Sequence, residues 1–269
     1  MWWPSPRVLT GWSIERGTRA GAGSGFAFNE WAHDAGAKRL LGVDFPAGRG
    51  RDEGVRLLKL LAHHPATLHH ISAKLCARLV NDTPPDGCID DAVAAWKQSD
   101  GDIRAVVRAI VRSPDFWADA NQSAKVKTPL EFVISAVRAV GGLPDTTARI
   151  PAAIATLGQP LYQQTAPTGY PETQEDWVNS GALLNRMNFA VALAAGKIPG
   201  IALDLDAVVP LTSDREKLAT EVDRVILHGT MTGTTRAVIL REIRVLTNPA
   251  AQRAMAVGLA LGGPEFQRQ

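Results

Sequence analysis

The sequence predicts an all-α protein, either a multi-helix bundle or an irregular array of helix pairs, with one small β-hairpin near the N-terminus. Two observations support this fold class. Apolar residues recur at spacings of three and four in most segments after residue 50, which is the pattern of helices that bury one face. Glycine and proline stand between these segments, where they end one helix and begin the next. We expect very little sheet beyond the hairpin.

The composition excludes several classes of protein. The chain has 269 residues, of which 45 % are hydrophobic and 21 % charged, as in an ordinary globular protein. Its net charge of +2 comes from mixed charges and forms no basic stripe, so we expect no nucleic-acid partner. No run of about 20 apolar residues is present, so we expect no membrane span. The sequence requires no cofactor.

We expect one all-α domain over 1–269, in three parts. Residues 1–50 form the hairpin and a polar loop, 51–145 a first helical group, and 146–269 a proline-rich loop with a second helical group. In the first part, short aromatic runs around Trp12 and Phe28 flank a glycine-rich tip, which favours a hairpin.

The helices are expected from their start and stop residues. Arg51 to Ala62 carries a leucine stripe, and Pro65 then begins a helix with an apolar stripe. The members of that stripe are Leu68, Ile71, Leu75 and Leu79. Later, Thr173 and Asp176 resemble a capping box that begins a helix near Gln174 and continues it to about Ala195.

The two cysteines, Cys76 and Cys88, are too few for a disulfide scaffold and are wrongly spaced for a zinc site. Cys76 shares a helix row with Ser72 and Val80, which favours a small buried thiol. A disulfide between the two cysteines is the alternative if the protein is exported.

The first candidate site is the loop from His33 to Lys38, which holds His33, Asp34 and Lys38 between glycines. His64, at a helix start, is the fourth candidate catalytic residue. The competing interpretation is structural: Asp34 makes an Asx-turn and His33 packs on Trp31.

The second candidate site is the stretch from Leu157 to Ala190, which is unusually rich in amides and aromatic residues. Flat rings and directed hydrogen-bonding groups together suit a carbohydrate or another polar organic ligand. The alternative is an architectural network that ties the loop to the following helix. The candidate ligand-binding residues are Gln159, Tyr162, Tyr170, Trp177, Asn179 and Arg186.

Lys125 and Lys127 precede a helix start, where the helix dipole favours anions rather than cations. A bound phosphate or carboxylate would explain this pair. Two solvated lysines are the simpler interpretation.

Six motifs occur in an order that resembles the C-terminal part of a bacterial family catalogued as domain of unknown function 1800. The resemblance covers nearly the whole chain. The motifs are Leu9-Thr10-Gly11-Trp12, His33-Asp34-x-Gly36-x-Lys38, His64-Pro65-Ala66-Thr67, Lys125-x-Lys127-Thr128-Pro129-x-Glu131-Phe132, Leu157-Gly158-Gln159-Pro160-Leu161, and Trp177-x-Asn179-Ser180-Gly181 through Arg186-x-Asn188-Phe189.

The resemblance implies a largely helical, exported protein whose gene commonly lies beside those of exported sulfatase-like proteins. It also implies a longer family domain, so that this chain is a truncated member, and a periplasmic or extracellular location. Met1 to Thr10 lacks the pattern of a secretory signal, which taken literally indicates the cytoplasm. Tyr170 stands where the family usually has tryptophan.

Three hypotheses follow. The protein is a binding or scaffold module of the cell envelope that acts with a sulfatase-like partner. Alternatively, it is a hydrolase-like enzyme in which His33 or His64 is the base, Asp34 orients it, and Lys38 or Arg186 stabilises negative charge. In the third, His33, Asp34 and His64 bind a divalent metal. No established catalytic signature supports the enzyme.

Overall fold

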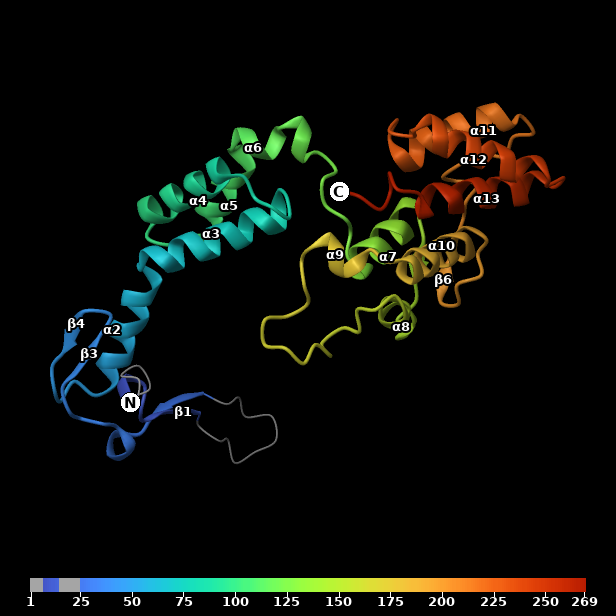
Figure 1. Cartoon of the computed structure of the whole chain (residues 1–269). Helices are drawn as coiled ribbons and strands as arrows, with labels where there is room; N and C mark the ends of the chain where they lie inside the picture. Colours follow the sequence, from blue (N-terminus) through green and yellow to red (C-terminus); the bar gives the residue numbers. More distant parts are fainter. Residues whose placement is uncertain (1–6, 15–24) are drawn as a thin grey trace. The chain divides into compact units, whose positions relative to one another are not determined.

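The computed structural model describes residues 7–14 and 25–269, and it is mainly helical (Figure 1). The predicted fold class is therefore confirmed. The chain divides into two compact units, one of Met1–Leu75 with Ile89–Val111 and the other of Cys76–Cys88 with Arg112–Gln269. The single-domain organisation stays a prediction.

The predicted hairpin is present in the first unit. Strand β1 (Trp12–Ile14) pairs antiparallel with β2 (Phe26–Phe28), and Trp12 lies opposite Phe28. The tip of this hairpin falls outside the described residues. The prediction of a small N-terminal hairpin is confirmed.

A second hairpin follows, which the sequence analysis did not separate from the polar loop. Strand β3 (Lys38–Leu40) pairs with β4 (Val43–Phe45), and Lys38 is the first residue of β3 rather than a loop residue. The two-residue turn has positive φ angles at Leu41 (49°) and Gly42 (78°), as a tight hairpin turn of type I′ requires. Leucine is a rare residue in this conformation, so the usual sequence signal for such a turn was missing.

The first unit has a small core where the second hairpin meets the following helix. Helix α2 (Arg51–Ala62) has the predicted bounds, and its Leu57 packs with Phe45 and Val8. Gly54 of α2 lies against the indole of Trp12, where a Cβ would come within 2.2 Å of the ring. The N-terminal segment and the hairpins are therefore anchored on α2.

Three further long helices follow α2, and a 3-10 turn precedes it. They are η1 (Glu30–Ala32), α3 (Pro65–Leu79), α4 (Asp86–Ser99) and α5 (Ile103–Arg112). The buried row of α3 is Leu68, Ser72, Cys76 and Val80, at spacings of four. Leu79, predicted to be part of the core stripe, is 38 % exposed. The predicted stripe was therefore wrong at its end, because the small side chains Ser72 and Cys76 occupy the packed face.

Cys76 near the end of α3 forms a disulfide with Cys88 near the start of α4. Both cysteines are completely buried. The free-thiol interpretation was wrong, and the alternative disulfide is what the structure contains.

The second unit holds the remaining elements. They are α6 (Pro114–Trp117), η2 (Asp119–Asn121), α7 (Pro129–Ala139), β5 (Leu143–Pro144), α8 (Arg149–Thr156), α9 (Gln174–Trp177), α10 (Ser180–Ala194), β6 (Ile201–Ala202), α11 (Arg215–Val222), the π-helix η3 (Asp223–Leu227), α12 (Gly233–Arg244) and α13 (Pro249–Gly262). Strands β5 and β6 form a two-residue antiparallel pair.

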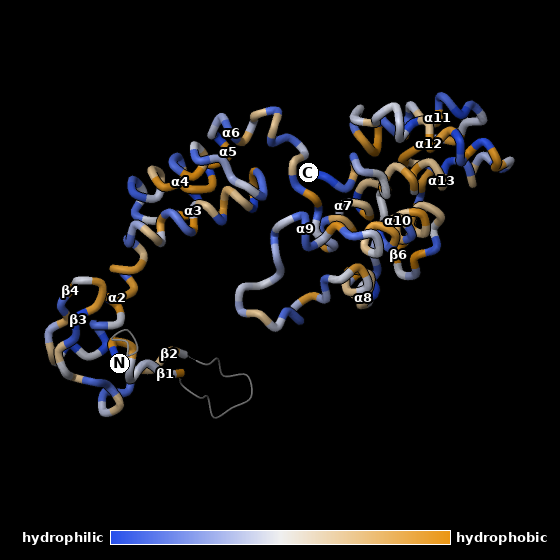
Figure 2. The backbone as a smooth tube through the Cα atoms, in the orientation of Figure 1, coloured by the Kyte–Doolittle hydropathy of each residue, from blue (hydrophilic) through white to orange (hydrophobic). Residues whose placement is uncertain are grey.

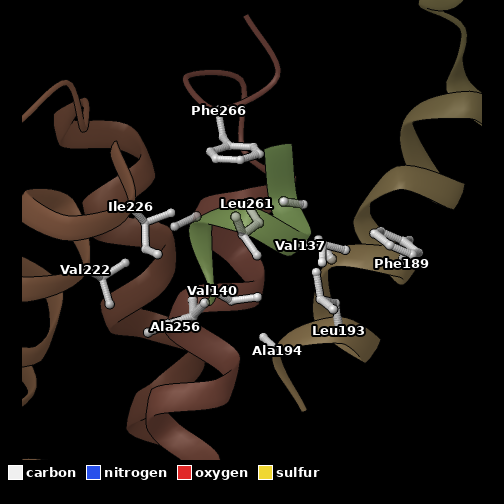
Figure 3. Close-up of a cluster of buried hydrophobic side chains, with 14 of the residues drawn as sticks. Val137, Val140, Phe189, Leu193, Ala194, Val222, Ile226, Ala256, Leu261 and Phe266 are labelled. Carbon is white, nitrogen blue, oxygen red and sulfur yellow. The ribbon is translucent and has the colours of Figure 1, made fainter. Parts of the chain in front are cut away.

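The main core lies between α7, α10, α13 and the π-helix, where hydrophobic positions concentrate (Figure 2). Figure 3 shows side chains from these elements converging on Leu261 of α13. Helices α10 and α13 approach closely because α13 has glycine at two contact positions. A Cβ on Gly258 would lie 2.8 Å from the Cα of Val191, and one on Gly262 would lie 2.4 Å from the sulfur of Met187.

The predicted helix from Gln174 to about Ala195 is two helices. Helix α9 ends at Trp177, and Asn179 then has extended dihedrals (φ −137°, ψ 165°) before α10 begins at Ser180. The Asn179 side chain accepts a hydrogen bond from Ala182 N at 2.9 Å and so caps α10. Asn179 therefore caps the start of the helix that carries Arg186 and does not project from a continuous helix.

Candidate functional site

The structure brings together two of the four predicted catalytic side chains, His33 and Lys38, with the carboxylate of Glu53. Lys38 Nζ donates to Glu53 Oε2 at 2.6 Å and also to the backbone oxygen of Asp34. His33 Nε2 lies 3.7 Å from Glu53 Oε1. The side chains of His33, Lys38 and Glu53 are 3 %, 0 % and 1 % exposed. We call these three residues the buried ionic cluster.

The backbone around the N-terminal segment holds this cluster in place. His33 Nδ1 lies 2.9 Å from the oxygen of Thr10, and the hydroxyl of Thr10 accepts from Asp34 N at 2.8 Å. The His33 ring packs edge-on against Phe28 at a centroid distance of 5.4 Å, while Trp31 is 87 % exposed. The predicted packing of His33 on Trp31 was therefore wrong.

Asp34 faces away from the ionic cluster. Its carboxylate accepts from Arg7 at 2.7 Å and from Gly36 N at 2.9 Å, and the second bond is the expected Asx-turn. The hydrogen bond from Arg7, and then that from Gly36, lowers the pKa of Asp34 to about 2. The carboxylate next to the His33 ring is that of Glu53, so Asp34 does not orient this imidazole.

Glu53 is the functional residue that the sequence analysis missed. It lies in the first turn of α2, four residues before the buried Leu57, on the side of the helix that faces the core. An acid on an apolar helix row needs a buried partner. That position was the available signal.

His64 has a local structural role at the start of α3. Its Nδ1 lies 3.2 Å from Ala66 N, and its backbone oxygen accepts from Thr67 and Leu68. Its hydrogen bonds therefore belong to the start of α3 and not to the buried ionic cluster. Within residues 7–14 and 25–269, no group of three or more His, Cys, Asp or Glu side chains is arranged to hold a metal ion.

In the second candidate site, three residues stabilise the proline-rich loop. Gln159 is buried, and its Oε1 accepts from Leu130 N at 2.8 Å, at the start of α7. Tyr170 donates to Pro160 O at 2.6 Å, and the Trp177 indole donates to Pro171 O at 3.0 Å. The Tyr170 and Trp177 rings lie 6.1 Å apart. The first bond ties the loop to α7, the second lies within the loop, and the third joins the loop to α9.

Tyr162 differs from the other aromatic residues of this loop. Its side chain is fully exposed and its φ is +60°. A non-glycine residue with positive φ costs free energy, and such residues gather at functional sites. Tyr162 is thus the aromatic ring of this loop that is accessible to a ligand.

Arg186 lies in the core of the second unit and is 1 % exposed. Its guanidinium stacks over Phe132 at 5.4 Å, and Nη1 donates to Gln267 Oε1 at 3.3 Å. Its Nε and Nη2 are buried without a hydrogen-bond partner among the described residues. Burial lowers the pKa of this guanidinium, and the charge of Glu131 offsets part of that effect.

A cavity of about 320 Å³ borders the same segment. Its walls include Gln174 and Val178 from the α9 region, Leu183 and Met187 from α10, and Gln267. The cavity thus meets the hydrogen-bond partner of Arg186. The buried ionic cluster belongs to one compact unit and this segment to the other.

The lysine pair before α7 divides into two different environments. Lys125 is buried and forms an ion pair with Asp82. Lys127 donates to Phe266 O at 2.6 Å and lies 4.0 Å from the centre of the Phe266 ring. The simpler interpretation of two solvated lysines does not hold for Lys125, because its ammonium is buried beside a carboxylate.

No described helix is both long and apolar enough to cross a membrane. The comparison with curated proteins and the comparison with solved structures each found no match. One family model matches residues 5–268, nearly the whole chain, and its description is "Protein of unknown function (DUF1800)". That the chain is the C-terminal part of a longer family domain stays a prediction. The chain belongs to the DUF1800 family.

Proposed function

We propose that the protein is a binding or scaffold module of the cell envelope that acts with an exported sulfatase-like partner. The observation that carries the proposal is the buried ionic cluster. Its histidine, lysine and carboxylate, which an enzyme would present to a substrate, are almost inaccessible, and the lysine and the carboxylate form an ion pair inside the fold. The charges of the buried ionic cluster therefore stabilise the fold of the first unit, and we assign the binding function to the surface of the protein.

The disulfide supports a periplasmic or extracellular location. Disulfides form and persist in oxidising compartments and are rare in the cytosol of most organisms. Cys76 and Cys88 join two consecutive helices, and both are completely buried. This bond favours export of the protein.

The exposed ring of Tyr162 supports a polar or carbohydrate ligand as a second binding function. A flat aromatic surface packs against the apolar face of a sugar ring. In a binding titration, we expect a soluble envelope oligosaccharide to quench or shift the intrinsic fluorescence of the native chain. Tyr162→Ala should abolish this change in fluorescence. An unaltered titration in Tyr162→Ala would remove this ligand class.

Capture from the native host tests the main proposal. The tagged chain is expressed in the bacterium, its envelope fraction is solubilised, and co-purifying proteins are identified. We expect enrichment of the sulfatase-like protein encoded beside this gene, relative to a tagged envelope protein of similar size. Repeated captures that never enrich such a protein would argue strongly against the scaffold function.

The hydrolase-like alternative retains one specific observation. His33 Nε2 and Glu53 Oε1 are both buried without a hydrogen-bond partner among the described residues. An imidazole nitrogen that lies beside a carboxylate and has no hydrogen-bond partner is the arrangement expected of a general base. Under the enzyme hypothesis His33→Gln abolishes turnover of a sulfate or carboxylic ester while the fold is kept. We expect instead that this variant loses stability and that the native chain hydrolyses neither ester.

A further inference from the structure

A second surface of the molecule combines a groove with unbalanced positive charge. A groove of about 970 Å³ lies between α7, the π-helix and the C-terminal tail. All three elements belong to the second compact unit. We call this feature the α7 groove. Its volume is within the range of ligand sites in proteins.

The chain forms the groove by pairing its C-terminal tail with the segment before α7. Val126 and Arg268 form an antiparallel bridge, and Lys127 N donates to Gln267 O at 2.8 Å. This pairing brings Phe266 and Arg268 beside Lys127, although they are about 140 residues apart in the sequence. Figure 3 shows Phe266 and Ile226, two groove residues, beside the core that α7 completes.

Three cations line the α7 groove without a carboxylate partner among the described residues. Lys127 bonds only to a backbone oxygen, that of Phe266, and Arg268 donates to Ala124 O at 3.3 Å. The exposed guanidinium of Arg138 has neither a hydrogen bond nor an ion pair with a described residue. The groove therefore holds three cations that form no ion pair with a described residue.

Two acidic side chains, those of Glu131 and Glu265, also line the groove. Glu131 forms an ion pair with Arg78 and accepts from the backbone and hydroxyl of Thr128. Burial alone would raise the pKa of Glu131, but these hydrogen bonds and Arg78 lower it below its usual value. Glu265 accepts through Oε1 from Thr232 and Thr235 at the start of α12, while its Oε2 is buried without a hydrogen-bond partner among the described residues. Neither acid forms an ion pair with Lys127, although, against the effect of burial, the charge of Glu131 raises the pKa of this lysine.

An apolar stripe runs beside these charges. Leu130 and Ile134 are one turn apart on α7, both line the groove, and both are more than a third exposed. Val225 and Leu227 of the π-helix line the groove with them. An extended apolar strip next to unpaired cations is complementary to a ligand that has an anionic head and an apolar chain.

The backbone of the opposite wall is irregular. The π-helix ends at His228, which has a left-handed conformation (φ 54°), and both line the groove. The π-helix is rare in proteins, and single-turn π segments occur frequently at functional sites. A non-glycine residue in the left-handed region adds a cost of roughly 1–2 kcal/mol. The shape of this wall is therefore maintained against a local energetic cost.

We propose that the α7 groove binds an amphipathic carboxylate, with the carboxylate at Lys127 and the alkyl chain along Leu130 and Ile134. Burial lowers the pKa of Lys127 to about 8, because the ammonium is partly removed from water. A ligand carboxylate would restore the interactions that this ammonium lost. Arg138 and Arg268 would add long-range attraction at the rim. This function is independent of the envelope partner.

Decanoate below its micelle concentration is a suitable probe, measured by isothermal titration calorimetry against the full chain at pH 7. We expect saturable binding at one site. Lys127→Met should weaken it about tenfold or more, because a charge-assisted hydrogen bond is lost. Arg138→Gln should weaken it by a smaller factor, and Lys127→Arg should restore most of the affinity. Arg104→Gln, an exposed arginine of the other unit, is the matched control and should bind as the native chain does.

The charge of the probe and the pH provide further readouts. Decylammonium has the same chain length and the opposite charge, so we expect no saturable binding of it. Decanoate binding should weaken toward the value of Lys127→Met as the pH rises from 7 to about 9.5, because the ammonium loses its proton. His228, Glu131, Glu265, Arg138 and Arg268 also line the groove, so a pH effect that persists in Lys127→Met would not come from this lysine.

The proposal is overturned if Lys127→Met, folded by circular dichroism, binds decanoate as tightly as the native chain does. Equal binding of decylammonium, or decanoate binding that does not saturate, would also overturn it. If Lys127→Met does not fold, Arg138→Gln decides the question, because the Arg138 side chain is exposed and has no hydrogen bond or ion pair with a described residue. Unchanged affinity in that variant would then contradict the proposal.

Discussion

Replacing Glu53 with glutamine keeps the shape of the side chain and removes the negative charge that faces Lys38. The ammonium of Lys38 is completely buried, so it cannot recover hydration by a small movement. Breaking a buried ion pair by removing one partner costs about 3–5 kcal/mol. Lys38 keeps its bond to the Asp34 oxygen, which argues for the lower end of this range. We expect Glu53→Gln to lower the free energy of unfolding by about 3 kcal/mol.

Urea denaturation followed by tryptophan fluorescence and far-ultraviolet circular dichroism measures this loss. The double variant Lys38→Met, Glu53→Leu removes both charges and should recover most of the stability, since no uncompensated charge remains. Asp44→Asn is the control, because Asp44 faces Arg39 across the same hairpin in an exposed pair. It should change stability by no more than about 0.5 kcal/mol. If Glu53→Gln costs no more than this control, the buried ionic cluster does not stabilise the fold.

Three other expectations follow from the packing, and each is checked by denaturation of the purified chain. Gly258→Ala should lower the free energy of unfolding by about 1–2 kcal/mol, because its Cβ would collide with the backbone of α10. The control Gly233→Ala should leave this free energy unchanged, since a Cβ at Gly233 meets no atom within 4 Å. Equal effects of the two substitutions would contradict the close approach of α10 and α13. Cys76→Ser should lower the free energy of unfolding by roughly 3 kcal/mol, because the disulfide with Cys88 no longer closes the loop between the two residues. A reductant should not destabilise this variant further. Arg186→Met should change the free energy of unfolding by no more than about 1 kcal/mol or should increase it, because two guanidinium nitrogens have no hydrogen-bond partner among the described residues. A loss above about 3 kcal/mol would show that the fold needs this charge.

The helices could be predicted where periodicity and start residues agree. The spacing of leucines and the flanking Gly and Pro residues gave α2 with the observed bounds. The capping box at Thr128 and Glu131 begins α7, and Pro249 after Asn248 begins α13. These signals are local, so the sequence contains them directly.

Two parts of the fold were predicted wrongly, for different reasons. In the first, a residue that favours a helix start lies inside a longer apolar pattern. Residues 174–195 have one continuous pattern, but Asn179 leaves the helical conformation and caps a new helix. The β3–β4 hairpin was not predicted, because Leu41 occupies a turn position that usually has asparagine or glycine. Both of these conformations depend on tertiary packing, and local patterns in a single sequence do not predict that packing.

The candidate sites were only partly predictable, for a related reason. The glycine-bounded loop correctly brought His33 and Lys38 together, but their partner Glu53 comes from a different element, α2. In the α7 groove, Lys127 was noted in the sequence, while Phe266 and Arg268 reach it only through the pairing of the C-terminal tail. Contacts between distant segments set the chemistry of both places, and composition does not encode those contacts.

The most direct test of the proposed function is the association of this chain with an exported sulfatase-like protein from the same organism. The two purified proteins are mixed at micromolar concentration, with the Cys76–Cys88 disulfide intact, and examined by sedimentation velocity. The scaffold function predicts a single faster species with the summed mass of both proteins, and dissociation at low concentration. Two independent boundaries at every concentration up to about 100 μM would contradict it, because a complex with a dissociation constant below about 100 μM would be populated at that concentration.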